Sequence, residues 1–326
     1  MNRAELLKRA ALAAASPSSF LLPHPRWRFV FVNHATTNPF FVPARYGIAD
    51  ACSLFGVACD WRGSKQSDVP EMVSAMDHAI ASRVDGIAVS VIDPGSFNGP
   101  TERALEHGIP VIAYNADGGH DNKRLSYVGQ DLYQAGLQFG ARIAALVHEG
   151  EVFLFIATPG QLNIQPRIDG ALDALRDSGK PITARVVGTG ALVASEYRKI
   201  EQTFLAHKGL RGMFAVDAGS TAGVAAVMRR HALHGKGVRA GGFDLLPSTL
   251  DAINRGDLDF TIDQQPYLQG FLPVQQLFLY HYTGGLVAPA ETNTGLKFVT
   301  RANVRRYLTT TTRYEGSSRD EKYPIS

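Results

Sequence analysis

The chain has 326 residues, of which 45% are hydrophobic and 19% charged, and its formal net charge is +3. These values are typical of a globular protein, and because acidic and basic residues are interspersed without a basic run, nothing indicates nucleic-acid binding. No apolar segment is long enough to span a membrane, and two cysteines are too few for a zinc cluster made of cysteines. The length favours two domains over one.

The first 26 residues have the features of a weak export signal. Three basic residues, Arg3, Lys8 and Arg9, precede the Ala-rich stretch 10–15 and further small residues. This order is typical of secretory signal peptides, although the apolar part is short. The alternative is an Ala-rich surface helix. We assign residues 1–26 as an export-signal remnant or disordered leader and expect a periplasmic or extracellular protein.

Strand and helix patterns alternate through the rest of the chain. The apolar residues 29–32 are too few for a helix and predict a strand buried on both faces, and apolar residues then recur at helical spacing from Phe41 to Phe55. Further strands are predicted near 57–61, 86–90, 110–115, 125–128, 151–156, 184–187, 213–216, 238–243, 260–262 and 296–299. Further helices are predicted near 69–80, before 107, and near 132–148, 167–178, 196–207, 221–231, 247–254 and 266–282. Such alternation requires crossover connections, so it predicts doubly wound, mainly parallel sheets with helices on both faces.

The pattern starts again near residue 151, which predicts two similar α/β lobes. Three segments, 128–130, 263–266 and the Pro/Gly/Thr-rich run 284–295, look like crossings between the lobes and predict a three-segment hinge. The predicted division is 27–129 with 265–291 for the N-terminal lobe, 130–264 with 292–316 for the C-terminal lobe, and 317–326 for a polar tail.

The two cysteines lie close together in the sequence. Cys52 falls on the first predicted helix and Cys59 on the next predicted strand, and a helix end and the following strand can come within disulfide reach. Two buried free thiols are an equally good interpretation. An oxidising compartment would favour the bridge.

Polar side chains recur where the predicted strands end. In an open α/β sheet ligands bind beyond the carboxyl ends of the strands, beside helix N-termini. The candidates at these ends are Asn38, Asp93, Asn115, Asp217, Asp244 and Gln264, and Arg167 opens a helix. Amides, carboxylates and one guanidinium group suit a ligand with many hydroxyls, since each hydroxyl both donates and accepts hydrogen bonds. Any one of these residues alone is equally well explained as a turn or helix cap.

An aromatic pair, Phe40 and Phe41, follows the first predicted strand. Asn38 suits a helix cap and Pro39 a first helical turn, which places the pair at the rim of the predicted crevice. Adjacent side chains point in different directions, so one ring can face the core while the other packs against the apolar side of a sugar ring. The alternative is that both rings belong to the core.

Motifs for catalysis or cofactors are missing from the sequence. The patterns G-x-G-x-x-G, G-x-x-x-x-G-K-[ST] and G-x-S-x-G do not occur, and the ten histidines form no convincing metal-ligand pair. Asp and Arg in a crevice can do acid–base chemistry, so an enzyme remains the rival interpretation. We predict a binding protein, with no enzyme activity, no cofactor and no metal site.

Several motifs, in order along the chain, resemble the ribose-type periplasmic sugar-binding proteins. The segment 38–41 resembles the Asn-Pro-Phe-Phe turn of that family, and 242–244 matches its Gly-Phe-Asp. Arg167 with Gly170 resembles its Arg-x-x-Gly helix start, with Gln165 as a weaker candidate beside it. The remaining similar segments are 111–115, which ends in Asn115, 214–217, which ends in Asp217, and 261–266, which contains Gln264.

The resemblance implies a type I periplasmic binding protein fold and a function. The protein is expected to be the monomeric solute-binding component of an ABC-type sugar importer, whose partners are a monosaccharide or polyol and a membrane permease. The N-terminal lobe would supply Asn38, Phe40, Phe41, Asp93 and Asn115, and the C-terminal lobe Gln165, Arg167, Asp217 and Asp244, with Gln264 at the hinge. Ala116 stands where the ribose-type pattern has an arginine, so the particular sugar stays open.

Two other functions are compatible with the same fold. One is the effector-binding domain of a LacI-type transcription regulator, but residues 1–27 are too short for its DNA-binding headpiece. The other is a protein that captures the furanosyl signal autoinducer-2.

Overall fold

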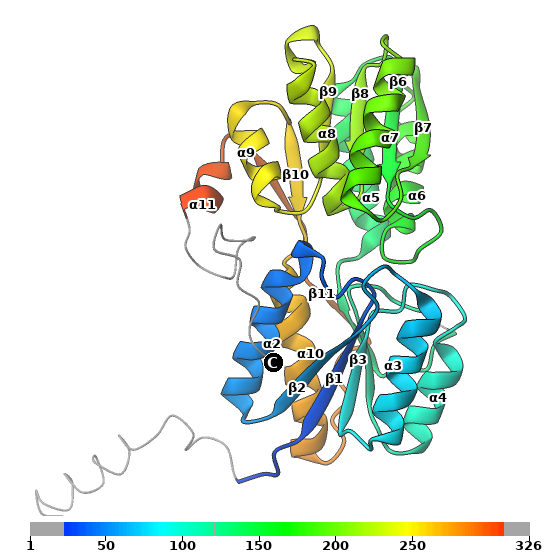
Figure 1. The fold of residues 1–326 in the computed structure, drawn as a ribbon, viewed down its shortest axis with the longest axis vertical. Helices are drawn as coiled ribbons and strands as arrows, with labels where there is room; N and C mark the ends of the chain where they lie inside the picture. Colours follow the sequence, from blue (N-terminus) through cyan, green and yellow to red (C-terminus); the bar gives the residue numbers. More distant parts are fainter. Residues whose placement is uncertain (1–22, 120, 310–326) are drawn as a thin grey trace, which may run out of the picture.

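Two lobes, each built on a six-stranded sheet, make up the part of the chain that the structure describes (Figure 1). This structure is a computed structural model and describes residues 23–119 and 121–309. Most of the predicted leader, the end of the predicted C-terminal lobe and the predicted tail therefore lie outside the described residues.

The first sheet has the strand order β11-β5-β4-β3-β1-β2, with every neighbouring pair parallel. Its strands are β1 Arg28–Asn33, β2 Ala58–Gly63, β3 Gly86–Val89, β4 Val111–Tyr114, β5 Ser126–Gly129 and β11 Glu291–Asn293. The helices of this lobe are the 3-10 helix η2 Pro39–Phe41, α2 Val42–Phe55, α3 Val69–Ala81, α4 Asn98–Glu106 and α10 Pro266–Thr283. Helices α2 and α10 lie on one side of the sheet and α3 and α4 on the other (Figure 1).

The second sheet has the order β12-β10-β9-β8-β6-β7, and only the β10–β12 pair is antiparallel. Its strands are β6 Gly150–Ile156, β7 Ile182–Gly188, β8 Gly212–Ala215, β9 Arg239–Phe243, β10 Phe260–Asp263 and β12 Lys297–Thr300. The helices of this lobe are α5 Leu132–Leu146, α6 Gln165–Asp177, α7 Val193–Ala206, α8 Ala218–Arg230, the 3-10 helix η3 His234–Lys236, α9 Pro247–Arg255 and α11 Val304–Thr309.

Each sheet has a hydrophobic core on both faces. In β1, Phe29 and Phe31 pack in the core under α2 and α10, while Val30 and Val32 pack in the opposite core under α3 and α4. Successive side chains of a strand point to opposite faces, so an unbroken apolar run fills both cores. This confirms the prediction of a strand buried on both faces.

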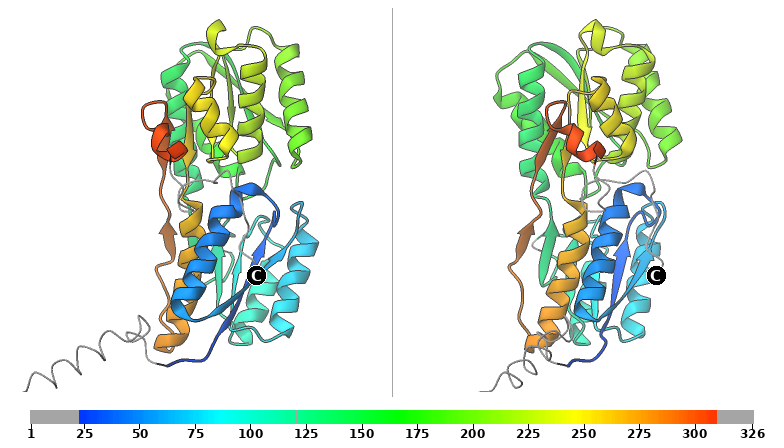
Figure 2. Two further views of the ribbon diagram at one scale, coloured as in Figure 1. Left: turned by 60° about the vertical axis from the view of Figure 1, so that its left-hand side comes forward. Right: turned by 90° about the vertical axis from the view of Figure 1, so that its left-hand side faces the viewer.

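The chain passes between the lobes three times. The crossings follow β5, β10 and β11, and Figure 2 shows the last of them running along the side of the molecule from β11 to β12. Strand β11, at residues 291–293, lies in the segment that the sequence analysis described only as a crossing, and it pairs with β5. The predicted lobe boundary between residues 291 and 292 therefore falls inside a strand of the first sheet.

Glycines let two pairs of helices pack very closely. A Cβ atom on Gly270 of α10 would lie 1.9 Å from the carbonyl oxygen of Ala44 in α2. In the other lobe, a Cβ atom on Gly170 of α6 would lie 2.3 Å from the carbonyl oxygen of Tyr133 in α5, and one on Gly136 would lie 2.5 Å from that of Arg167. No larger residue fits these positions without moving a helix, so the glycines fix the spacing within each pair.

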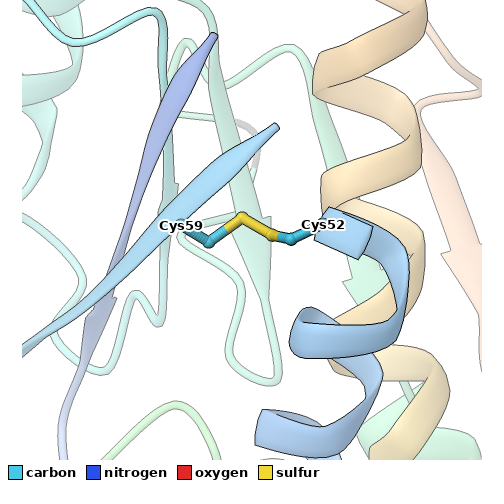
Figure 3. The surroundings of a disulfide bond; sticks show 2 residues. All are labelled: Cys52 and Cys59. Atoms are coloured by element: carbon cyan, nitrogen blue, oxygen red, sulfur yellow. A yellow bond between two sulfur atoms is a disulfide. The ribbon is translucent and has the colours of Figure 1, made fainter. Parts of the chain in front are cut away.

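Cys52 at the end of α2 and Cys59 in β2 form a disulfide (Figure 3). Their Cα atoms are 6.5 Å apart. The sequence left the bridge and two free thiols as alternatives, and the structure has the bridge. It ties a helix of the N-terminal lobe to the edge strand of the same lobe.

Two absences apply to residues 23–119 and 121–309. None of their helices combines the length and apolar character needed to cross a membrane. Nor do three or more of their His, Cys, Asp and Glu side chains gather where they could hold a metal ion.

Candidate sugar-binding site

A cavity of about 50 Å³ lies between the two lobes, at the carboxyl ends of both sets of strands. A cavity of this size has room for about three to five water molecules, which would occupy roughly 100–150 Å³ in liquid water. Its lining residues are His34, Asn38, Phe40, Phe41, Asn115, Asn163, Ile164, Arg167, Asp217, Ala218, Asp244 and Gln264. The cavity therefore combines polar groups from both lobes with two aromatic rings, in the volume of one small ring-shaped ligand.

The rim of the N-terminal lobe is formed by the turn after β1. The Asn38 side chain accepts a hydrogen bond from the backbone N–H of Phe40, and Pro39 opens the 3-10 helix that follows. Phe41 is buried in the core below, whereas Phe40 is half-buried, and their ring centroids are 4.7 Å apart in an edge-to-face arrangement. The two rings thus differ in burial as predicted, and both contribute to the cavity wall.

Two of the lining residues follow corresponding strands in the two lobes and share an unusual backbone. Asn115 follows β4 with φ of 63°, and Asp244 follows β9 with φ of 76°. Left-handed conformations are uncommon outside glycine, and Asn and Asp tolerate them best. Both side chains are buried. The chain accepts strain at these two positions, which is a frequent feature of functional sites.

A chain of amide hydrogen bonds connects these two residues across the hinge. Asn115 Nδ2 donates to Gln269 Oε1 at 3.0 Å, Gln269 Nε2 donates to Gln264 Oε1 at 3.1 Å, and Gln264 Nε2 donates to Asp244 Oδ1 at 2.7 Å. Gln269 belongs to α10, and the sequence analysis did not find it. We call Asn115, Gln269, Gln264 and Asp244 the hinge relay. None of its bonds uses Asn115 Oδ1 or Asp244 Oδ2, which are acceptors suited to a hydroxyl group.

Arg167 is a fully buried guanidinium group at the start of α6. Nη1 donates to the backbone oxygen of Val216 at 2.8 Å, Nη2 donates to Gln130 Oε1 at 3.0 Å, and the group lies 4.2 Å from the centre of the Phe243 ring. Its Nε is buried without a hydrogen-bond partner in the described structure. Burial lowers the pKa of Arg167, and Asp244 opposes that shift. A ligand oxygen is the kind of acceptor that an unpaired buried N–H needs.

Burial also changes the two carboxyl groups of the cavity. It raises the pKa of Asp244 to about 6, even though Arg167 and the hydrogen bond from Gln264 lower it. The pKa of Asp217 is raised by burial as well, against hydrogen bonds from Ser220 and Ala157. Asp217 caps α8 by accepting from Ser220 N at 2.8 Å, and its other oxygen accepts from Ala157 N at 2.9 Å. Both carboxyl groups are held in place by local hydrogen bonds.

The lobes also touch each other beside the cavity. His34 Nε2 and Asn163 Nδ2 are 3.3 Å apart across the cleft, and the backbone N–H of Leu162 donates to the oxygen of Ile92 at 3.0 Å. His34 Nδ1 is 2.9 Å from Ser90 Oγ. Burial lowers the pKa of His34 to about 4, so its imidazole is neutral near pH 7. The lobes of the structure are therefore in contact across the cleft.

The structure does not bring all of the predicted site residues together. Asp93 holds the turn after β3, where Oδ1 accepts from the N–H and hydroxyl groups of Ser96. Gln165 bonds locally as well, accepting from Gly160 N and donating to Asp169. Neither residue lines the cavity. Conversely, His34 and Asn163 line it and were missed; His34 directly follows the strand end Asn33, which is the signal that identified the other candidates.

Comparisons with known proteins agree with this geometry. A family model described as "Periplasmic binding protein domain" matches residues 29–281. The chain belongs to the periplasmic binding protein family.

Individual relatives extend this result. The xylose/arabinose-binding protein XylF of Sulfolobus acidocaldarius is 51% identical over 309 residues, which are 90% of this chain and 76% of the relative. A solved ABC-transporter solute-binding protein of Burkholderia graminis, in complex with D-arabinose, is 28% identical with a TM-score of 0.80 and covers 87% of this chain and 98% of its own. The arabinose-binding protein AraP of Geobacillus stearothermophilus is 27% identical with a TM-score of 0.71, covering 86% and 99%.

These findings confirm several predictions for this periplasmic binding protein. The two-lobed type I fold is confirmed, and so is the prediction of a binding protein rather than an enzyme. The predicted function, the sugar-binding component of an ABC importer, is confirmed at that level.

Proposed function

We propose that this periplasmic binding protein captures a pentose between its lobes and delivers it to a membrane permease. The observation that carries the proposal is the hinge relay, which joins a strand end of each lobe and three of whose four residues line the cavity. The names of the relatives, with xylose and arabinose among their ligands, support the choice of a pentose.

The cavity residues have distinct parts in this binding. Asn115 and Asp244 accept hydrogen bonds from sugar hydroxyls, and Arg167 donates one through its unpaired Nε. Phe40 packs against the apolar C–H side of the ring, with Phe41 behind it. A sugar that meets both lobes has its full set of contacts only when the lobes are closed, so it shifts the population towards the closed form.

The place of action proposed for this protein is outside the cytoplasmic membrane. The disulfide between Cys52 and Cys59 supports this, because such bridges persist mainly in oxidising compartments. The weak signal in the first 26 residues points the same way. The permease would then recognise the closed, loaded form at the membrane.

Thermal unfolding of the full chain with D-xylose, L-arabinose, D-ribose, D-glucose and myo-inositol tests the proposal. A sugar at about a hundredfold over its dissociation constant adds roughly 2.7 kcal/mol of stability. The matched variants are Asp244→Asn in the cavity and Asp93→Asn outside it. We expect a pentose to raise the melting temperature of the wild type and of Asp93→Asn, and Asp244→Asn to need at least tenfold more sugar. No shift with any sugar would refute the proposed function, and equal shifts in both variants would refute the site.

A further inference from the structure

A much larger space lies beside the sugar cavity, between the same two lobes. We call this space, of about 280 Å³, the outer chamber. Its walls come from both lobes: Lys65, Gln66 and Ser67 on one side, and Thr158, Ala191 and Glu196 on the other. Asn38, Asn163 and Asp217 line both spaces, so the two lie next to each other. The chamber remains open although the lobes are already in contact at His34 and Asn163, so contact between the lobes does not eliminate it.

A buried carboxyl group without a partner lines this chamber. Glu196, in the first turn of α7, is 4% exposed, and its Oε2 has no hydrogen-bond partner in the described structure. The group lies against the first turn of α8, where a Cβ atom on Gly219 would be 2.0 Å from Oε2 and would displace the carboxyl group. Burial, and then the neighbouring Asp217, raise the pKa of Glu196. A buried polar atom without a partner destabilises the protein, and a hydrogen bond with a ligand hydroxyl would remove that cost.

Two further features of the chamber suit a second sugar ring. Asn163 Oδ1, at the junction with the cavity, is another buried acceptor without a partner in the described residues. Leu192 at the chamber wall is 57% exposed, which is high for a large apolar side chain. Unpaired acceptors together with an exposed apolar surface match the two sides of a sugar ring, its hydroxyl groups and its C–H face. Together the two spaces reach the roughly 300 Å³ at which small-molecule binding sites begin.

From this geometry we propose that the outer chamber is a second sugar subsite, so that the protein binds disaccharides and other glycosides of the pentose held in the inner cavity. The inference rests on the proposed function, because the first ring occupies the inner cavity. The second ring lies between the loop at residues 65–67 and the start of α7, and it supplies the hydrogen bond that Glu196 Oε2 lacks.

Titration calorimetry with the full chain tests the subsite, with D-xylose, L-arabinose and disaccharides built from them as probes. We expect at least one disaccharide to bind within tenfold of its monosaccharide. Ala191→Trp narrows the chamber from an exposed position without touching the inner cavity. It should weaken the disaccharide at least tenfold and change monosaccharide affinity less than twofold. Glu196→Leu should weaken the disaccharide about tenfold, whereas Glu196→Gln, which keeps hydrogen-bonding groups, should change it less than threefold.

The outcomes separate this inference from the proposed function. Monosaccharide binding without any disaccharide binding would overturn the subsite and leave the pentose function intact. Disaccharide binding that is insensitive to Ala191→Trp and Glu196→Leu would also overturn it. Failure of every sugar to bind would overturn the proposed function, and the subsite with it.

Discussion

Replacing Asp244 by Asn should make the ligand-free protein more stable while it weakens sugar binding. The pKa of this buried carboxyl group rises from 3.8 to about 6 in the folded protein. Below pH 3.8 the group is protonated in the folded and unfolded chains and has no effect. Between pH 3.8 and 6 the unfolded chain loses the proton first, so the free energy of unfolding falls as pH rises. Above pH 6 the penalty is constant, at about 3 kcal/mol for a shift of roughly two units.

Asn removes the charge and keeps the other requirements of the position. It tolerates the left-handed backbone, and its Oδ1 can still accept from Gln264 Nε2. We therefore expect Asp244→Asn to raise the free energy of unfolding at pH 7.5 by up to about 3 kcal/mol, and at pH 4 by less than about 1 kcal/mol. In contrast, losing a hydrogen bond to a charged acceptor should weaken sugar binding by about 1.5–3 kcal/mol, roughly ten- to a hundredfold.

Urea unfolding at pH 7.5 and pH 4, without ligand, measures the first effect, and calorimetric titration with a pentose measures the second. Asp93→Asn is the control, because that carboxyl group has a lowered pKa from its hydrogen bonds with Ser96 and lies outside the cavity. The reasoning fails if Asp244→Asn is no more stable than the wild type at pH 7.5, or if its stability gain is the same at both pH values.

Three further changes test other parts of the structure. Replacing Cys52 and Cys59 by serine should lower the free energy of unfolding by about 2.5 kcal/mol, the value expected from the loop-closure entropy of a short loop, and leave sugar affinity unchanged. Melting curves of the wild type with and without reductant, compared with that of the serine variant, check this. Gly170→Ala would push a Cβ atom against the carbonyl oxygen of Tyr133, so the free energy of unfolding in urea should fall by about 1–3 kcal/mol. An unchanged unfolding midpoint would contradict the close packing of α5 and α6. The pKa of His34 is lowered from 6.5 to about 4, so the free energy of unfolding should fall by about 3 kcal/mol as the pH drops from 6.5 to 4. His34→Gln should abolish this fall in acid titrations followed by circular dichroism. A variant as acid-sensitive as the wild type would refute this role of His34.

The sequence predicted the fold well because the strands have unambiguous patterns. Strand β1 is an unbroken apolar run, and such a run is expected of a strand covered by helices on both faces. Strand β11, in contrast, consists of Glu291, Thr292 and Asn293 at the edge of the sheet. Its pairing depends on the neighbouring strand β5 and not on its own composition, so no periodicity in the sequence could reveal it.

The site was only partly predictable, for a related reason. Polar residues at strand ends were the available signal, and it found Asn115, Asp244 and Gln264, which share the cavity. The same signal also selected Asp93, which caps a turn, because a cap and a ligand contact use the same residue types. Gln269 lies one helical turn into α10, and only the three-dimensional path of the chain through the hinge brings it between the two lobes.

The close packing of α5 against α6 has a consequence for transport. Gly136 of α5 lies directly against the backbone of Arg167, and the guanidinium group of Arg167 bonds to Gln130, in the crossing segment just before α5. Opening the lobes bends the chain at this crossing, so we expect it to disturb the bond between Gln130 and Arg167. Coupling between two binding events is reciprocal. If a permease holds the lobes apart and so lowers the affinity for sugar, bound sugar lowers the affinity for that permease by the same factor. The transporter can thereby release the sugar without touching it.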